Sequence, residues 1–299
     1  MKTNSSDSLY HALDLCASNN FERALAIADQ SLASVSTGEL ATLAHRVRGL
    51  ALSGMGQSDE AIDEINLALQ ANPRDAESLA FRALINRRQG DIDAAERDCR
   101  RALEIDPDSI QVHGELALVA LENQDYDTVT SESTIVIDSD EDDNESMRAD
   151  AYSWRAQAHL RLGNASQAMS DINMAIKTWP NNSSVYCGIR SDIHMANGDP
   201  SDAIDDVDLA LSSQPENPDL LFRKGRCLGA LGNFDEAVRF LSDAIKARSN
   251  FEEAILTRAA AFMNLDRNDK AMEDVEAVLS FNPRSDMALA MKQQLESGE

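Results

Sequence analysis

The chain has 299 residues, and its 52 acidic residues outnumber 27 basic ones, which gives a formal net charge of −25 at pH 7. A surface of this sign repels phosphate groups, so we expect no nucleic acid among its partners. Residues 1–9 lack the apolar core of a cleaved signal peptide. No apolar run approaches the roughly 18 residues that a membrane span needs. We therefore expect a cytoplasmic protein that does not bind membranes.

Composition also bears on the core and on redox chemistry. Aromatic residues make up only 5% of the chain, which leaves Ala and Leu to fill the core and favours closely packed helices. The cysteines are widely separated and form no C-x-x-C pair, so neither a zinc site nor a disulfide framework is indicated. We expect no cofactor and no metal, and reduced thiols at Cys16, Cys99, Cys187 and Cys227.

The chain repeats itself with a period of 34 residues, and we number the places of each repeat from its first residue. The register is clearest in residues 76–109, where Gly90, Ala95, Ala102 and Pro107 take places 15, 20, 27 and 32. In chain order, the predicted repeats are residues 5–38, 42–75, 76–109, 110–143, 149–182, 184–217, 218–251 and 252–285.

Each repeat is predicted to form two amphipathic helices. Place 15 carries Gly, or in three repeats Asn19, Gln124 or Asp266, and ends the first helix. An Asp or Asn beside it can cap the second helix, which Pro then closes. The small residues at places 8 and 20, such as Ala83 with Ala95, allow the two helices to pack closely.

The fourth repeat, residues 110–143, departs most from this pattern. It carries Gln124 at the glycine place and Val129 at the alanine place. Its run 134–137 is β-branched, which weakens helix propensity. An acidic insertion at about residues 138–148 separates this repeat from the fifth, and we expect the array to bend or loosen there.

This spacing of Gly, Ala and Pro resembles the tetratricopeptide repeat family over nearly the whole chain. The resemblance implies an all-α fold, a right-handed superhelical α-solenoid of about eight helix-turn-helix repeats over residues 1–285. Residues 286–299 would follow as a polar capping helix and tail, because the last repeat cannot otherwise cover its outer face. The resemblance also implies a concave groove lined by the first helices, in which such proteins hold peptide segments or partner subunits.

Ten groove residues follow from this resemblance. Family members contact their ligands through places two, five, nine, twelve and thirteen, and we carry these places onto the present chain. The predicted partner-binding residues are Glu77, Leu84, Arg87, Arg88, Gln157, Arg161, Asp192, Asp219, Phe222 and Arg226. No three consecutive repeats carry the Lys, Asn and Arg pattern of the family's chaperone-binding carboxylate clamp, so we expect no co-chaperone role.

Charged residues recur at two further places. A basic residue takes place 7 in six repeats, and in five of these an acid follows sixteen residues later, where the second helix should face the first. The predicted pairs are Arg48–Glu64, Arg82–Asp98, Arg155–Asp171, Arg190–Asp206 and Arg258–Asp274. Lys224 is expected to face Phe240 and so to lack this acid of its own repeat. The alternative, a ladder of arginines that binds a ligand, is less consistent with the matched acids.

The sharpest charge feature is residues 102–147, which carry fourteen acids and no Lys or Arg. The acidic patch within it comprises Asp138, Asp140, Glu141, Asp142, Asp143 and Glu145. Two interpretations stay open, a solvated loop between repeats or a docking surface for a basic segment of a partner. Calcium binding of the EF-hand type is not expected, because Asp143 stands where Gly is required and Ala149 where Glu must chelate.

The sequence carries no motif of known catalysis, since it lacks the phosphate-binding Gly-x-x-x-x-Gly-Lys, H-E-x-x-H and G-x-S-x-G patterns. The five histidines fall on predicted first helices, where we expect them to pack. We predict a non-enzymatic adaptor for protein–protein interaction that binds a peptide segment or a partner subunit in the groove, helped by the acidic patch where the partner is basic. The alternative is a self-associating structural scaffold. We expect a monomer, whereas the scaffold requires a homo-oligomer.

Overall fold

The computed structural model describes residues 5–139 and 144–297. Over these residues it contains α-helices and one short 3-10 helix but no strand, so the predicted all-α repeat solenoid is confirmed. The chain divides into two compact units, Met1–Asp142 and Asp143–Glu299, which we call the N-terminal and C-terminal units. The division falls inside the predicted acidic insertion.

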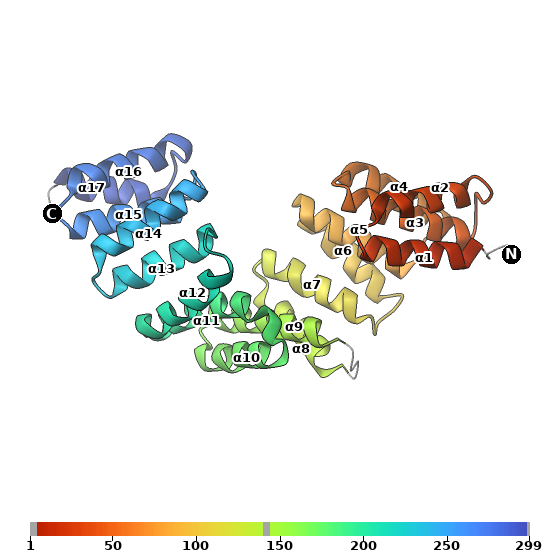
Figure 1. The fold of residues 1–299 in the computed structure, drawn as a ribbon, viewed down its shortest axis with the longest axis horizontal. Coiled ribbons are helices and arrows are strands. Elements are labelled where there is room, and N and C mark those ends of the chain that lie inside the picture. The colour runs from red at the N-terminus through yellow and green to blue at the C-terminus, as the bar shows by residue number, and fades with distance from the viewer. Residues whose placement is uncertain (1–4, 140–143, 298–299) are drawn as a thin grey trace. The chain divides into compact units, whose positions relative to one another are not determined.

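The N-terminal unit consists of four helical hairpins (Figure 1). Each first helix packs against the second helix that follows it, and each second helix packs on the next hairpin, so the hairpins form a continuous stack. In chain order the helices are α1 (Ser5–Ala17), α2 (Phe21–Leu32), α3 (Glu39–Gly54), α4 (Ser58–Ala71), α5 (Ala76–Gln89), α6 (Ile92–Leu103), α7 (Ile110–Glu122) and α8 (Tyr126–Asp138).

The C-terminal unit has four further hairpins that stack in the same way, and a final helix packs on the last of them. Its elements are α9 (Glu145–Arg161), α10 (Ala165–Thr178), the 3-10 helix η1 (Pro180–Asn182), α11 (Ser183–Asn197), α12 (Pro200–Ser213), α13 (Pro218–Ala230), α14 (Phe234–Ala247), α15 (Glu252–Asn264), α16 (Asn268–Phe281) and α17 (Asp286–Ser297). The last helix, α17, buries Ala288 against the cluster formed by α15 and α16, as a terminal cap must.

The turn inside each hairpin has one residue in the left-handed region of the backbone. It stands at place 15 in all eight hairpins, including the three where Gly is absent, as the repeat register predicts. Gly90 adopts φ +84° with open space where a Cβ would lie. Gln124 adopts φ 60° with a full side chain, which costs on the order of 1 kcal/mol.

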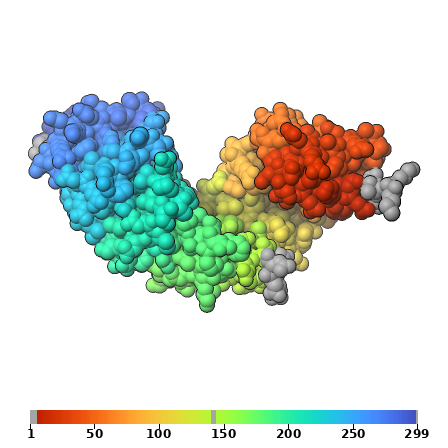
Figure 2. Space-filling model, viewed as in Figure 1, coloured from red at the N-terminus to blue at the C-terminus, as the bar shows by residue number. Residues whose placement is uncertain are grey.

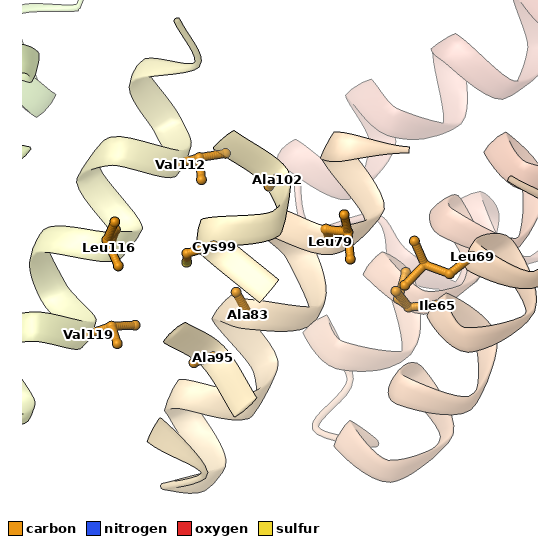
Figure 3. Packing of buried hydrophobic residues seen from close by; sticks show 10 residues of the cluster. All are labelled: Ile65, Leu69, Leu79, Ala83, Ala95, Cys99, Ala102, Val112, Leu116 and Val119. Carbon is orange, nitrogen blue, oxygen red and sulfur yellow. The ribbon is translucent and has the colours of Figure 1, made fainter. Parts of the chain in front are cut away.

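Small residues bring the two helices of a hairpin together. A Cβ on Gly225 would lie 2.5 Å from Cγ of Leu241, which is closer than van der Waals contact allows. Ala83 and Ala95 are fully buried at the equivalent interface of α5 and α6. Figure 3 shows the apolar cluster around them, which extends from α4 to α7: Ile65, Leu69, Leu79, Ala83, Ala95, Cys99, Ala102, Val112, Leu116 and Val119.

The β-branched second helix of the fourth repeat, α8, is regular despite its weak propensity. Val129 and Val136 are fully buried, so packing compensates for the entropy that β-branched side chains lose in a helix. The Thr134 hydroxyl donates to the carbonyl oxygen of Thr130 at 2.7 Å. Asp125 caps the helix by accepting from the backbone N–H of Thr128 at 3.2 Å.

The acidic insertion predicted at about residues 138–148 overlaps the ends of two helices. Asp138 is the last residue of α8, and α9 begins at Glu145, so residues 145–148 form its first turn. Glu145 suits this position because the helix dipole favours an acidic side chain near the N-terminus. The repeat register rests on Gly, Ala and Pro at fixed places. It therefore does not predict where a helix extends past the residues of one repeat.

Side chains close the spaces between the ribbons within each unit, as the space-filling view shows for the red to yellow N-terminal helices and the green to blue C-terminal helices (Figure 2). Ala, Leu, Ile and Val supply most of the buried apolar side chains, in keeping with the low aromatic content. None of the helices that the structure describes is long and apolar enough to cross a membrane.

Candidate partner-binding surfaces

The five predicted ion pairs within repeats are confirmed. Nε and Nη2 of Arg82 donate to the two carboxylate oxygens of Asp98, each at 2.7 Å. The same geometry recurs in three other pairs, and Arg48 lies 3.4 Å from Glu64. The hydrogen bonds to Asp98 raise the pKa of Arg82, so this guanidinium stays charged. Because these arginines already bind carboxylates of their own repeat, they tie the two helices together.

Lys224 faces Phe240 instead of an acid of its own repeat, but it has an acidic partner in the preceding hairpin. Its ammonium lies 4.5 Å from the centroid of the Phe240 ring, as predicted, but it also forms an ion pair with Asp208. Asp208 lies sixteen residues before Lys224, on the second helix of the preceding hairpin. Place 7 therefore faces two second helices, its own and the preceding one. Arg82 shows the same arrangement, since its Nη1 donates to Asn66 at 2.6 Å.

Four of the five histidines contact the acid at place 23 of their own repeat. His45 lies 2.8 Å from Glu64, and His113 lies 2.6 Å from Glu132. His159 and His194 approach the carboxylates of Asp171 and Asp206 at 3.8 and 3.6 Å. These contacts give the histidines a packing role. In residues 5–139 and 144–297, no three His, Cys, Asp or Glu side chains are grouped to hold a metal ion.

The first helices of the N-terminal unit, α1, α3, α5 and α7, contact one another in succession. We call the surface that they form the first-helix surface of this unit. It contains a pocket of about 620 Å³ that we call the leucine pocket. Its lining residues are Leu13, Arg46, Leu50, Ala76, Glu77, Ala80, Phe81, Leu84, Asp106, Ser109, Gln111, Val112 and Glu115.

Two of the four groove residues predicted in this unit, Glu77 and Leu84, line the leucine pocket. Arg87 lies beside it and donates to Glu115 at 2.5 Å and to Glu122 at 2.8 Å. Arg88 is exposed near the C-terminal end of α5 and does not line the pocket.

The sequence analysis missed Leu13, Leu50 and Phe81 as pocket residues. Leu13, Leu50 and Leu84 all occupy place nine of their repeats, so an alignment of that single place across repeats would have revealed the apolar row. Phe81 stands at place six, which is not among the places carried over from the family, and only the packing of neighbouring hairpins brings it to the pocket.

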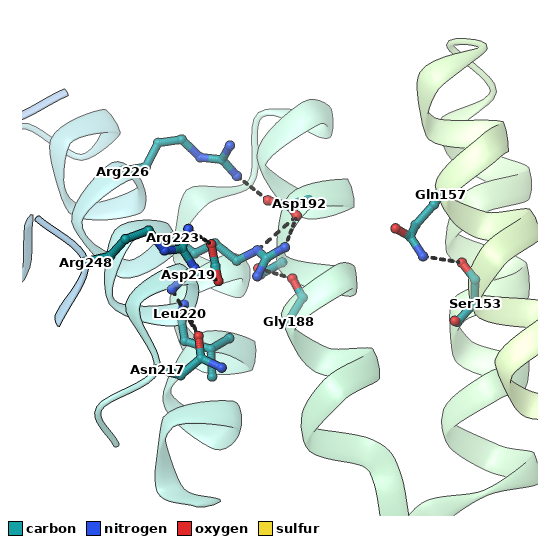
Figure 4. Close-up of polar contacts among 11 residues, drawn as sticks. Ser153, Gln157, Gly188, Asp192, Asn217, Asp219, Leu220, Arg223, Arg226 and Arg248 are labelled. Atoms are coloured by element: carbon teal, nitrogen blue, oxygen red, sulfur yellow. Dashed lines mark hydrogen bonds and ion pairs between the residues drawn. The ribbon is translucent and has the colours of Figure 1, made fainter. Parts of the chain in front are cut away.

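Three of the six predicted groove residues of the C-terminal unit, Asp192, Asp219 and Arg226, form hydrogen bonds with oppositely charged side chains (Figure 4). Asp192 accepts hydrogen bonds from Arg226 and from Arg223, the latter at 3.0 Å. Asp219 accepts from Arg248 at 3.0 Å. The sequence analysis missed both Arg223 and Arg248, since each pairs with an acid of a different helix.

Phe222 completes this group, because its ring centroid lies 5.7 Å from Cζ of Arg226 and 5.1 Å from the Phe251 ring. Gln157 lies apart from it and donates to the carbonyl oxygen of Ser153 at 3.3 Å on its own helix. Arg161 is exposed at the C-terminal end of α9. The cluster of paired charges and aromatic rings therefore contains four of the six predicted residues, Asp192, Asp219, Phe222 and Arg226.

The acidic patch is only partly described. Asp138 ends α8 and Glu145 begins α9, whereas Asp140, Glu141, Asp142 and Asp143 lie outside the described residues. Asp138 lines a hollow of about 600 Å³ together with Asp108 and Ile135. The docking role of the patch stays a prediction, as does the absence of a calcium site.

The cysteines are free thiols, and three of the four are buried. Burial raises the pKa of the Cys99 thiol to about 12 and that of Cys227 to about 11. Both thiols are therefore protonated at neutral pH and are poor nucleophiles. They serve as small apolar side chains in the core.

Two sequence models described as tetratricopeptide repeat match the chain, one over residues 46–110 and the other over residues 194–254. One match lies in each unit. The first of these stretches contains residues 76–109, the repeat in which the Gly, Ala and Pro register is clearest.

Solved structures with a similar fold include three that cover most of the chain. A chain of the Cut9–Hcn1 hetero-tetramer of the APC/C has a TM-score of 0.71 at 15% identity, over 92% of this chain and 52% of that chain. A tetratricopeptide repeat protein from Parabacteroides merdae has a TM-score of 0.68 at 14% identity, over 86% and 100%. Yeast Tom70 has a TM-score of 0.58 at 16% identity, over 99% and 65%. The present chain thus spans about half of the first structure and less than two thirds of Tom70, and these likenesses establish the fold.

Proposed function

This chain belongs to the tetratricopeptide repeat family, and we propose that it is a non-enzymatic adaptor that binds a peptide segment or a partner subunit on its first-helix surfaces. Members of the family are generally interaction modules without catalytic activity. The similar chain in the Cut9–Hcn1 hetero-tetramer is assembled with other chains, which supports a role as a partner-binding subunit.

The leucine pocket is the observation that carries this proposal. It lies on one unit, opens on the face of the first helices, and has Leu13, Leu50 and Phe81 among its lining. A concave apolar site with a few polar groups at its edge is where ligands generally bind. The ion pairs between places 7 and 23 hold the two helices of a hairpin together. The first-helix surface is then available to bind a partner.

The test is site-specific photo-crosslinking in native lysate. A benzophenone amino acid replaces Leu84 in the pocket, and in a matched variant it replaces Asp93, which is exposed on the second helix α6. We expect a partner to be crosslinked from position 84 and not from position 93, and mass spectrometry identifies it. Crosslinking from position 93 alone would move the binding surface to the second helices and contradict the proposal.

Self-association is the second candidate, and exposed apolar side chains near both ends of the repeat array favour it. Tyr10 on α1 is 58% exposed, and Met287 on α17 is 64% exposed. Sedimentation velocity over a range of concentrations distinguishes the two functions. The scaffold predicts that the sedimenting mass of the native chain rises with concentration and that the Met287→Glu variant stays monomeric. Both results together would favour the scaffold over the adaptor.

We place the adaptor in the cytoplasm, and the free cysteines support a reducing compartment. A basic partner segment on the acidic patch remains part of the proposal. Its test is a pull-down at low and high salt, because contacts between exposed charges are screened as ionic strength rises.

A further inference from the structure

Place nine carries leucine in every repeat of the N-terminal unit. These residues, Leu13, Leu50, Leu84 and Leu118, lie on α1, α3, α5 and α7 in turn. All four are only partly buried, although a leucine on a polar surface gains free energy when it is covered. The first three line the leucine pocket, so the row continues across neighbouring helices as an apolar strip.

The basic residues beside the pocket are already bound by acids. Arg46 donates to Asp75 at 3.1 Å and pairs with Glu77, which lines the pocket. Arg87 is held in the same way by Glu115 and Glu122. Each guanidinium therefore faces two carboxylates, and a ligand carboxylate would have to displace one of them.

The charge around the pocket is negative as a result. Two basic side chains, Arg46 and Arg87, are outnumbered by five acidic ones, which leaves a formal charge of −3. The acids are Asp75, Glu77, Asp106, Glu115 and Glu122. Asp106 is exposed at the edge of the pocket, and among the described residues no basic side chain forms an ion pair with it.

One wall of the pocket adds to this negative charge. Asp106, Gln111 and Glu115 belong to residues 102–147, which contain no Lys or Arg. On this wall Asp106 has no ion-pair partner among the described residues, whereas Glu115 is already paired with Arg87. The apolar lining selects for an apolar side chain, and the wall selects for positive charge beside it.

We propose that the leucine pocket binds a partner segment in which a large apolar side chain is flanked by Lys or Arg residues. The inference rests on the proposed adaptor function and names the chemistry of the segment. The apolar side chain enters the pocket between Leu50 and Leu84, and the flanking cations pair with Asp106 and with Glu77, whose side chain is 73% exposed.

The experiment is a selection of random displayed dodecapeptides on the full chain, followed by fluorescence anisotropy with one enriched peptide. We expect enriched sequences to combine Leu, Ile, Met or Phe with nearby Lys or Arg. Replacement of the apolar residue of that peptide by Ser, or of its basic residues by Glu, should each weaken binding by about tenfold or more. Enrichment of acidic peptides, or no enrichment, overturns the inference.

Two pairs of variants locate the site. Leu84→Gln should weaken the enriched peptide at least about tenfold, whereas Leu67→Gln, at a leucine 40% exposed on α4 and outside the pocket, should not. Asp106→Lys should weaken it about threefold or more at low salt, whereas Asp93→Lys, with the same change in net charge on α6, should have little effect. Circular dichroism confirms that each variant is folded. Equal losses within either pair overturn the inference.

The inference and the adaptor function fail in different ways. If a cellular partner is crosslinked from position 84 but enriched peptides lack the apolar and basic combination, the adaptor stands and the segment chemistry is wrong. If the peptides behave as expected but no cellular partner is crosslinked, the segment chemistry stands and the adaptor function is contradicted.

Discussion

The two units share one framework and differ in the residues at place nine of their first helices. Place nine is leucine in all four repeats of the N-terminal unit, and it is Gln157, Asp192, Arg226 and Ala260 in the C-terminal unit. The same helical position therefore yields an apolar pocket in one unit and an ion pair between Asp192 and Arg226 in the other. Residues that build a hairpin must recur, whereas residues that face away from it are free to diverge.

The largest expected effect tests whether the framework is equivalent in both units. Ala95 and Ala237 stand at place 20 of their repeats and are fully buried. Ala95→Arg and Ala237→Arg should each lower the free energy of unfolding by about 3 kcal/mol or more, because each buries an unpaired charge. Urea denaturation followed by circular dichroism measures both. A loss confined to one variant would show that the two frameworks are not equivalent.

Helix capping by the residue at place 16 should differ between the two units. Asp125 and Asp199 both stand at place 16, but only Asp125 accepts a backbone hydrogen bond at its helix N-terminus. Asp125→Ala should cost about 1 kcal/mol at neutral pH, whereas Asp199→Ala should cost little. The same denaturation experiment tests both, and equal losses would contradict the assignment of the cap.

The Asp125 cap should also depend on pH. Its hydrogen bonds to Thr128 lower the pKa of the Asp125 carboxyl below its ordinary value. A lowered pKa means that the contribution to stability is present above the unfolded-state pKa of about 4. It is lost as the pH falls through the folded-state value. The difference in the free energy of unfolding between the native chain and the Asp125→Ala variant should therefore shrink on acidification. A difference that stays constant with pH would contradict this role of the ionised carboxylate.

The coupling between neighbouring side chains at place nine should depend on salt in the C-terminal unit but not in the N-terminal unit. A double-mutant cycle on Asp192 and Arg226 should give a coupling of about 0.5–1 kcal/mol, because both side chains are partly exposed and screened by solvent. The coupling should fall in 1 M salt, where charges are screened within about 3 Å. A cycle on Leu50 and Leu84 provides the control, since any coupling between apolar side chains should not fall with salt.

The smallest expected effect concerns the left-handed turn residues Gln124 and Asp266, one in each unit. Gln124→Gly should stabilise the chain by about 0.5 kcal/mol, since the relief of backbone strain exceeds the added freedom of the unfolded chain. Asp266→Gly should change stability less, because Asp tolerates this conformation better than Gln. Differential scanning calorimetry measures both, and a larger gain at Asp266 would contradict the explanation.

The sequence predicted what lies within one repeat better than what lies between repeats. The left-handed residue at place 15, even as Gln124, and the pairing of places 7 and 23 follow from the register alone. The partners of Lys224 and Asp192 lie on helices of neighbouring hairpins, and one 34-residue period does not contain that information. In the leucine pocket Glu77 and Leu84 were predicted, whereas Leu13 and Leu50 were missed although they stand at the same place nine as Leu84.

The distribution of cysteines turns the chain into its own reporter of local opening. Cys16 and Cys99 lie in the N-terminal unit, and Cys187 and Cys227 in the C-terminal unit, each in a different repeat. A thiol whose pKa is raised by burial reacts with an alkylating reagent only after its hairpin opens to solvent. The alkylation rates of the three buried thiols, Cys99, Cys187 and Cys227, resolved by mass spectrometry, therefore give the order in which their hairpins open and show whether the two units unfold together.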